Sequence, residues 1–231
     1  MPTGKMYKVR KGPYRSSKSL KKQIKKIAKQ TVLAVAETKA VGVQTVGSPT
    51  VPALELKHNI VSYHGNLLAT KQGITDPNDY SSASARIGDE IILKNMNVRF
   101  QLSALRPNVT YRAVLFWYES GTTLANDIVY FTQGTKLLDR YNTEQISIID
   151  QKLITPNIGA LPADDANPRR TRLFTLNGNW KSKKIIYDNG GKNPRFKDIG
   201  FALVAYDSIN TLQTDDVGEF IYDYKMKFKD L

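Results

Sequence analysis

The stretch "MNVRFQL", residues 96–102, alternates large apolar and polar side chains along its whole length. This period of two is typical of a β-strand with one buried face and one solvated face. The pattern returns near the C-terminus in "FIYDYKMKF", residues 220–228, where five apolar or aromatic side chains share one face and Asp223, Lys225 and Lys227 share the other. Both stretches therefore indicate a protein built from β-sheet.

Two uninterrupted apolar runs lie between these stretches, "AVLFWY" at 113–118 and "FALVAY" at 201–206. Both are short and rich in β-branched or aromatic residues, so they favour central strands that are covered on both faces. Weaker strand candidates are 41–46, 53–62, 145–153, 171–176 and 183–187. One helix is expected in this part of the chain, around 124–139, although Gly134 would interrupt it.

The order of these elements predicts an all-β fold. About eight strands without strand–helix–strand alternation imply an antiparallel sandwich, of either the immunoglobulin or the jelly-roll type. The long connections 119–144 and 154–170 favour the jelly roll. We therefore expect an eight-stranded jelly-roll shell domain over residues 37–231.

Basic residues are concentrated at the N-terminus. Eleven cationic side chains precede the first acidic residue, Glu37, and the rest of the chain holds 23 basic and 21 acidic residues. Polycations bind nucleic acid by releasing condensed counterions, without regard to sequence. The predicted nucleic-acid-binding residues are Lys5, Lys8, Arg10, Lys11, Arg15, Lys18, Lys21, Lys22, Lys25, Lys26 and Lys29. Their bias towards lysine favours charge neutralisation over the reading of base edges.

This basic arm, residues 1–36, divides into two parts. Residues 1–16 are charged and contain glycine and proline, which predicts disorder. From about 19 to 30, Leu20, Ile24 and Ile27 recur at helical spacing, which predicts a short amphipathic helix with lysines on its other faces. A solvated surface helix or a membrane-surface helix remain as alternatives. Nuclear import receptors also read basic runs of this kind, so we add nuclear localisation as a hypothesis.

The sequence carries few signals of catalytic or metal chemistry. The chain has no cysteine, no G-x-S-x-G elbow and no complete phosphate loop around "NGGKN", so we expect no enzyme and no cofactor. His58 and His64 are expected to be ordinary histidines rather than metal ligands. The doublets Asp164–Asp165 and Asp215–Asp216 are expected in solvated loops, with a structural Ca²⁺ at subunit contacts as the alternative.

The consecutive rings Phe116, Trp117 and Tyr118 allow two interpretations. They could form a platform on which nucleic-acid bases stack. Packing in the core and at a subunit interface fits the uncharged run better. No signal peptide and no membrane span is visible, so we expect a soluble, intracellular protein without a membrane partner.

Three segments of the chain resemble, in order and spacing, the satellite tobacco necrosis virus-like coat proteins. They are "ARIGDEIILKNMNVRFQL" (85–102), "YRAVLFWYESGTTLANDIVYF" (111–131) and "LLDRYNTEQISIIDQKLIT" (137–155). The matching features are Gly88-Asp89, the strand Val114 to Tyr118, Gly121-Thr122-Thr123 and Tyr141-Asn142. The stretch "IGFALVAYDS" (199–208) is similar to a further strand. Similar coats occur in circular single-stranded DNA viruses.

The resemblance implies a jelly roll with BIDG and CHEF sheets, a T=1 shell of about 60 identical subunits, and an arm that packages a single-stranded DNA or RNA genome. It also implies that Leu20, Ile24 and Ile27 contact the arm helices of neighbouring subunits. The protein would be found in the virion, and in the host cytoplasm or nucleus during assembly. The main alternatives are a non-viral nucleic-acid-binding protein with a β-sandwich domain and a jelly-roll enzyme or lectin.

Overall fold

The computed structural model describes residues 17–35, 38–44, 53–73, 85–131, 134–155, 170–208 and 211–230. The chain divides into a first unit that ends at Ala36 and a second unit, Glu37–Asp230. The described part of the first unit is helix α1 (Ser17–Val35), which continues five residues beyond the expected end at residue 30. The disorder expected for 1–16 lies outside the described residues.

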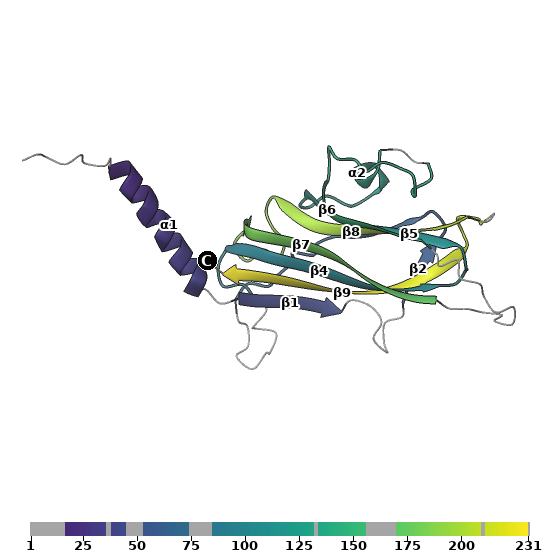
Figure 1. The fold of residues 1–231 in the computed structure, drawn as a ribbon, viewed down its shortest axis with the longest axis horizontal. Helices are drawn as coiled ribbons and strands as arrows, with labels where there is room; N and C mark the ends of the chain where they lie inside the picture. The colour runs from purple at the N-terminus through teal and green to yellow at the C-terminus, as the bar shows by residue number, and fades with distance from the viewer. Residues whose placement is uncertain are drawn as a thin grey trace, which may run out of the picture. The chain divides into compact units, whose positions relative to one another are not determined.

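The described residues of the second unit form two antiparallel sheets that pack face to face (Figure 1). One sheet consists of β1 (Thr38–Gln44), β2 (Leu54–Lys57), β4 (Glu90–Ala104), β7 (Arg170–Ile186) and β9 (Asp216–Asp230). The other consists of β3 (Val61–His64), β5 (Val109–Glu119), β6 (Ser147–Ile154) and β8 (Lys197–Asp207). The all-β sandwich expected from the sequence is thus confirmed.

The strand order is that of a jelly roll. The first sheet runs β1-β9-β4-β7, with β2 paired to the same β9 further along, and the second runs β3-β8-β5-β6. If β1 and β2 together are strand B and the remaining strands are lettered in chain order, these sheets are BIDG and CHEF. The expected topology is therefore confirmed, with strand B split into two pieces.

The structure joins two of the predicted strands into one and divides another into two. Residues 171–176 and 183–187 belong to one long strand, β7, which pairs with β4 from Glu90 to Ala104. The candidate 53–62 is instead two strands, because the chain turns at Asn59 (φ 57°) and passes from the first sheet to the second. Three polar residues, Lys57, His58 and Asn59, interrupt the apolar pattern at this turn, and the prediction of a single strand passed over that break.

The central strands β5 and β8 are covered on both faces, as their apolar sequences predicted. Their inward side chains meet those of the first sheet in the main core, and the other face carries a second cluster of buried residues. The connection between β5 and β6 supplies this cover, with the short helix α2 (Asn126–Val129) lying over the sheet (Figure 1). The helix expected over 124–139 is thus limited to four residues. Val129 reaches the sheet from α2, whereas Tyr130, Tyr141 and Ile146 reach it from backbone outside the helix.

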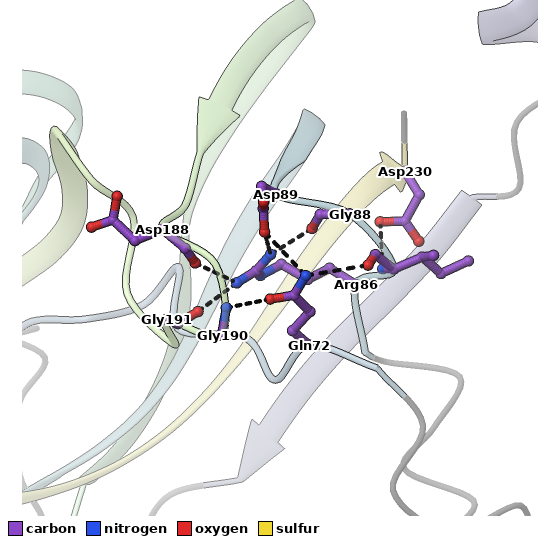
Figure 2. Close-up of polar contacts among 9 residues, drawn as sticks. Gln72, Arg86, Gly88, Asp89, Asp188, Gly190, Gly191 and Asp230 are labelled. Carbon is purple, nitrogen blue, oxygen red and sulfur yellow. Dashed lines mark hydrogen bonds and ion pairs between the residues drawn. The ribbon is translucent and has the colours of Figure 1, made fainter.

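A buried arginine joins the loops at one end of the first sheet (Figure 2). The Arg86 side chain is fully buried and donates hydrogen bonds to the carbonyl oxygens of Gly88, Asp188 and Gly191, and to Asp89 Oδ1 at 3.2 Å. Its guanidinium also lies 4.4 Å from the centre of the Tyr187 ring. These contacts join the segment before β4, at Arg86–Asp89, to the loop after β7, at Asp188–Gly191. We call these two segments the Arg86 loops.

The same end of the sheet holds the start of β1. Lys39 Nζ lies 2.7 Å from Asp230 Oδ2 and donates a hydrogen bond to Ala85 O at 2.9 Å. The Ile87 amide donates to Asp230 Oδ1 at 3.4 Å. The start of β1 is therefore linked to the loop that contains Arg86 through the end of β9.

A half-buried histidine and a buried aspartate respond to pH in opposite directions. His64 lies between the sheets, where it stacks on Phe201 and shares hydrogen bonds with Tyr222 and Ser62. Burial lowers the pKa of His64 to about 4. Burial raises the pKa of Asp198 to about 6, against the lowering effect of hydrogen bonds from the Ile199 and Leu68 amides.

These shifts predict opposite effects of two substitutions on acid stability. Between about pH 6.5 and 4 the unfolded chain protonates at His64 before the folded chain does, so this residue lowers the unfolding free energy as pH falls. Asp198 takes up its proton first in the folded chain, so over about pH 6 to 4 it raises the unfolding free energy. Each effect amounts to about 3 kcal/mol, since one pKa unit is about 1.4 kcal/mol.

Denaturant unfolding at pH 7 and pH 4 measures both effects. Relative to the unsubstituted chain, His64→Gln is expected to reduce the loss of stability on acidification, and Asp198→Asn is expected to increase it. Changes in the same direction for both variants would contradict the assignment.

Candidate nucleic-acid interface

The sequence of α1 separates charge from apolar groups around the helix axis. At about 100° per residue, Leu20, Ile24 and Ile27 fall within a strip about 60° wide. The lysines of the helix occupy a sector of about 140° on the opposite side; they are Lys18, Lys21, Lys22, Lys25, Lys26 and Lys29. No glycine or proline interrupts residues 17–35, so the amphipathic helix forms without a break.

The exposure of these side chains suits contact with other molecules. Lys21, Lys22, Lys25 and Lys26 are exposed, and so are Leu20 (60%), Ile24 (57%) and Ile27 (62%). Lys18 and Lys29 lie in the helix, but their side chains are not among those described. The predicted binding residues Lys5, Lys8, Arg10, Lys11 and Arg15 lie outside the described part of the chain. The structure thus brings four of the eleven predicted cations together on one helix face.

Like charges make this helix costly to form alone. Lys21 and Lys22 are each followed four residues later by another lysine, and Lys18 and Lys25 have the same spacing to Lys22 and Lys29. Such pairs destabilise an isolated helix by a few tenths of a kcal/mol each. A polyanion bound along the lysine face would remove this repulsion, so phosphate binding and helix formation favour each other.

The second unit carries a further set of cations that the prediction of the binding site did not include. Strand β9 changes sign along its length, from Asp216, Glu219 and Asp223 to Lys225, Lys227 and Lys229. Their neighbours Met226 and Phe228 are buried, so these three lysines point away from the core. Their partners on β1 are the small residues Thr38, Ala40 and Gly42.

Amide side chains lie beside these lysines on β4 and β7. In the strand register, Lys225 lies next to Asn97 and Lys227 next to Asn95. Asn97 Nδ2 donates to Asn177 Oδ1, and Asn95 Nδ2 donates to Asn179 Oδ1 at 2.7 Å. We call this surface the lysine–asparagine face; it comprises Lys225, Lys227, Lys229, Asn95, Asn97, Asn177 and Asn179. The start of β1, at Thr38, pairs with Lys229, so this face reaches the strand with which the second unit begins.

The remaining candidates from the sequence have structural partners. The His58 ring nitrogen Nδ1 accepts the Asp207 amide at 3.1 Å. Arg106 donates to Asp215 Oδ2 at 3.1 Å and lies 3.6 Å from Asp207 Oδ2, so a calcium ion at Asp215 would have to compete with a guanidinium. The other doublet, Asp164–Asp165, lies outside the described residues. Within the described residues, no three His, Asp or Glu side chains gather as a metal site.

The consecutive rings of β5 point in alternating directions. Phe116 and Tyr118 belong to the second buried cluster, under the β5–β6 connection. Trp117 points the other way, into the space between the sheets, and is 8% exposed. The run is thus packed in the core, as the second interpretation expected, with Trp117 at its margin.

Comparison with known proteins does not assign the chain to a family. No family model and no curated protein matches the chain. Among solved structures, a chain of Desmodium yellow mottle tymovirus aligns at 9% identity over 84% of this chain and 87% of its own, with a TM-score of 0.34. VP1 of Trichodysplasia spinulosa-associated polyomavirus, in complex with 3′-sialyllactose, aligns at 12% identity over 84% and 76%, with a TM-score of 0.13. At these values the likenesses carry no argument about function, and the fold rests on the strand pairing above.

In the described residues, no helix is long and apolar enough to cross a membrane.

Proposed function

We propose that this protein is a viral coat subunit that assembles into a small icosahedral shell and packages single-stranded nucleic acid through its basic arm. The observation that carries the proposal is the separation of charge along the chain. Eleven cations precede Glu37, whereas the jelly roll that follows is close to neutral. A neutral shell domain can pack against copies of itself while the arm neutralises phosphate.

The arm binds nucleic acid without reading its sequence. The exposed lysines of α1 form a single face that can follow a phosphate backbone, and the lysine–asparagine face provides a second cationic surface on the sandwich. Lysine binds phosphate as a point charge and places few geometric demands on its partner. This chemistry suits the packaging of a whole genome of either DNA or RNA.

A T=1 shell of ~60 subunits would enclose on the order of 660 arm cations. That charge suits a genome of about one to two thousand nucleotides, with other cations neutralising the remaining phosphates. We further propose that Leu20, Ile24 and Ile27 contact the same residues in the helices of neighbouring subunits. A second copy of this chain is a suitable occupant because each copy presents the same exposed apolar strip.

The size and contents of the purified protein test this proposal. The full chain at neutral pH and low salt is expected to form particles in the megadalton range that contain nuclease-protected nucleic acid of about one to two thousand nucleotides. A sharp species near 26 kDa, or its dimer, would instead favour a nucleic-acid-binding protein that does not form a shell.

A truncated chain separates the remaining alternative. Deletion of residues 1–30 is expected to abolish packaging, whereas a lectin or an enzyme would keep its ligand binding or activity in the sandwich. A full chain with Leu20, Ile24 and Ile27 all replaced by Ser tests the helix contact, because it keeps every cation. Intact particles from this variant would refute the contact.

A further inference from the structure

A small cavity opens between the two sheets, away from the lysine–asparagine face. Its volume is about 230 Å³, and it lies where the end of β5, the end of β7 and the start of β8 meet. The side chains that matter for its chemistry are Trp117, Lys183, Phe196 and Lys197. This volume is below the usual range of pockets for drug-sized ligands, so the cavity suits a single ring system.

The cavity has an aromatic wall that is open to solvent. Phe196 is 60% exposed, although large aromatic side chains are usually buried. Trp117 lies deeper and meets Trp180 edge to face, with ring centres 5.4 Å apart. An accessible ring of this kind provides a surface on which a nucleic-acid base can stack, whatever the base.

Cations lie around these rings. Lys183 Nζ is 5.2 Å from the Trp117 ring centre, and the Arg195 guanidinium is 5.3 Å from that of Phe196. Among the described residues, neither Lys183 nor Lys197 forms an ion pair, even though Glu119 is the cross-strand partner of Lys197. Lys184, by contrast, is paired with Glu90 at 2.6 Å. Two ammonium groups thus remain to meet phosphates on either side of a base.

The cavity is also close to the point where the arm joins the sandwich. Lys183, Leu93, Phe228 and Lys39 lie in one row across β7, β4, β9 and β1. Three strand spacings amount to about 14 Å, roughly the length of two to three nucleotides of an extended strand. The start of β1 is therefore separated from this cavity by the length of only a few nucleotides.

From these contacts we infer that the cavity binds one base of single-stranded nucleic acid, which stacks on Phe196 while Lys183 and Lys197 hold the flanking phosphates. The inference rests on the proposed function, because it takes the ligand of the arm as its ligand. It adds a fixed contact with the base to the sequence-independent contacts of the arm.

The chain contains only two tryptophans, and both lie at this cavity or against its floor, so intrinsic fluorescence reports its occupancy. The experiment uses the full chain, freed of nucleic acid by nuclease and high salt. Two probes are titrated at low salt: a 20-nucleotide oligothymidylate and an abasic strand with the same number of phosphates. Both should bind, as followed by probe anisotropy. Only the thymidylate should change tryptophan emission, and it should bind about 5- to 100-fold more tightly.

Two variants and one control sharpen the test. Phe196→Ala should remove most of the preference for thymidylate, and Lys183→Gln should weaken binding of the thymidylate more than that of the abasic strand. Leu173→Ala is the control, because Leu173 is a similarly exposed apolar residue (78%) on the outer face of the first sheet. It should change neither probe.

The outcomes separate this inference from the proposed function. If neither probe binds, packaging by the arm fails, and the base site fails with it. If both probes bind equally and change emission equally, or if Phe196→Ala keeps the thymidylate signal, only the base site is refuted. A third result also refutes the base site: neither probe changes tryptophan emission, and Phe196→Ala prevents particle formation. This result would show that the cavity forms a contact between subunits.

Discussion

Replacement of Lys21, Lys22, Lys25 and Lys26 by Gln is expected to lower the affinity of the full chain for single-stranded nucleic acid by about 100- to 1000-fold at 0.1 M salt. Each phosphate neutralised on a single strand contributes about 0.7 to the slope of log affinity against log salt. These four exposed lysines lie on one helix face, so they can engage one strand together. Their loss should make the slope shallower by about 2 to 3.

Titration of a fluorescent oligonucleotide between about 0.05 and 0.5 M salt gives both the affinity and the slope. Glutamine and lysine have similar helix propensities, so the helix is retained and only charge changes. The control carries the same loss of charge on the sandwich, at the exposed residues Lys57, Lys71, Arg140 and Lys152. Equal slopes for the two variants would show that net charge, and not the helix face, determines binding.

The sandwich could be predicted from the sequence because its signals are local. The alternation at 96–102 and 220–228 became β4 and β9, and the apolar runs at 113–118 and 201–206 became the doubly covered strands β5 and β8. Each pattern reports which side of one strand is buried, and this is set by the strand's own residues. The division of 53–62 at Asn59 was missed, because the gap of three polar residues at Lys57–Asn59 is too short to distinguish a turn from a solvated stretch of one strand.

The candidate site was only partly predictable, for a related reason. The arm was visible because its eleven cations all precede the first acidic residue, Glu37. The lysine–asparagine face needs three strands that are far apart in the chain, and only their register places Asn95 and Asn97 beside the lysines of β9. The signal in the sequence was the spacing of Lys225, Lys227 and Lys229 at every second residue. That spacing identifies a common face but not its neighbours.

The Arg86 loops could not be predicted either, because no local pattern marks a buried arginine. The guanidinium donates to Gly88, Asp188 and Gly191, whose carbonyl groups come from two loops about one hundred residues apart (Figure 2). Gln72 extends the network, since its side chain donates to Asp89 Oδ1 at 3.0 Å and accepts the Gly190 amide at 2.6 Å. The arginine therefore adds side-chain hydrogen bonds to loops that are also joined through the backbone, where the Tyr187 amide donates to Asp89 O at 2.8 Å.

Arg86→Met is expected to lower the free energy of unfolding by about 3 to 5 kcal/mol, which is a large part of the stability of an ordinary domain. Methionine fills a similar volume, but it leaves the carbonyl oxygens around the buried guanidinium without this donor, at a cost of about 1 to 3 kcal/mol for each one that water does not reach. Asp89 is less affected, because its side chain is 45% exposed and water can solvate it. Most of the loss should therefore come from the carbonyl groups, and Arg86→Lys should recover only part of it.

Arg195→Met is the control that shows whether the loss is specific to the buried arginine. The unfolding free energies of both variants are measured with guanidinium chloride as the denaturant and tryptophan fluorescence as the signal. Arg195 also contacts the loop after β7, through Asp188 Oδ1 at 3.7 Å, but both side chains are mostly exposed. An exposed ion pair contributes at most about 1 kcal/mol, so this variant should remain close to the unsubstituted chain. Similar small losses for both variants would mean that the Arg86 loops can rearrange around a missing guanidinium. A loss confined to Arg86 would show that its buried hydrogen bonds stabilise the end of the sheet from which the arm extends.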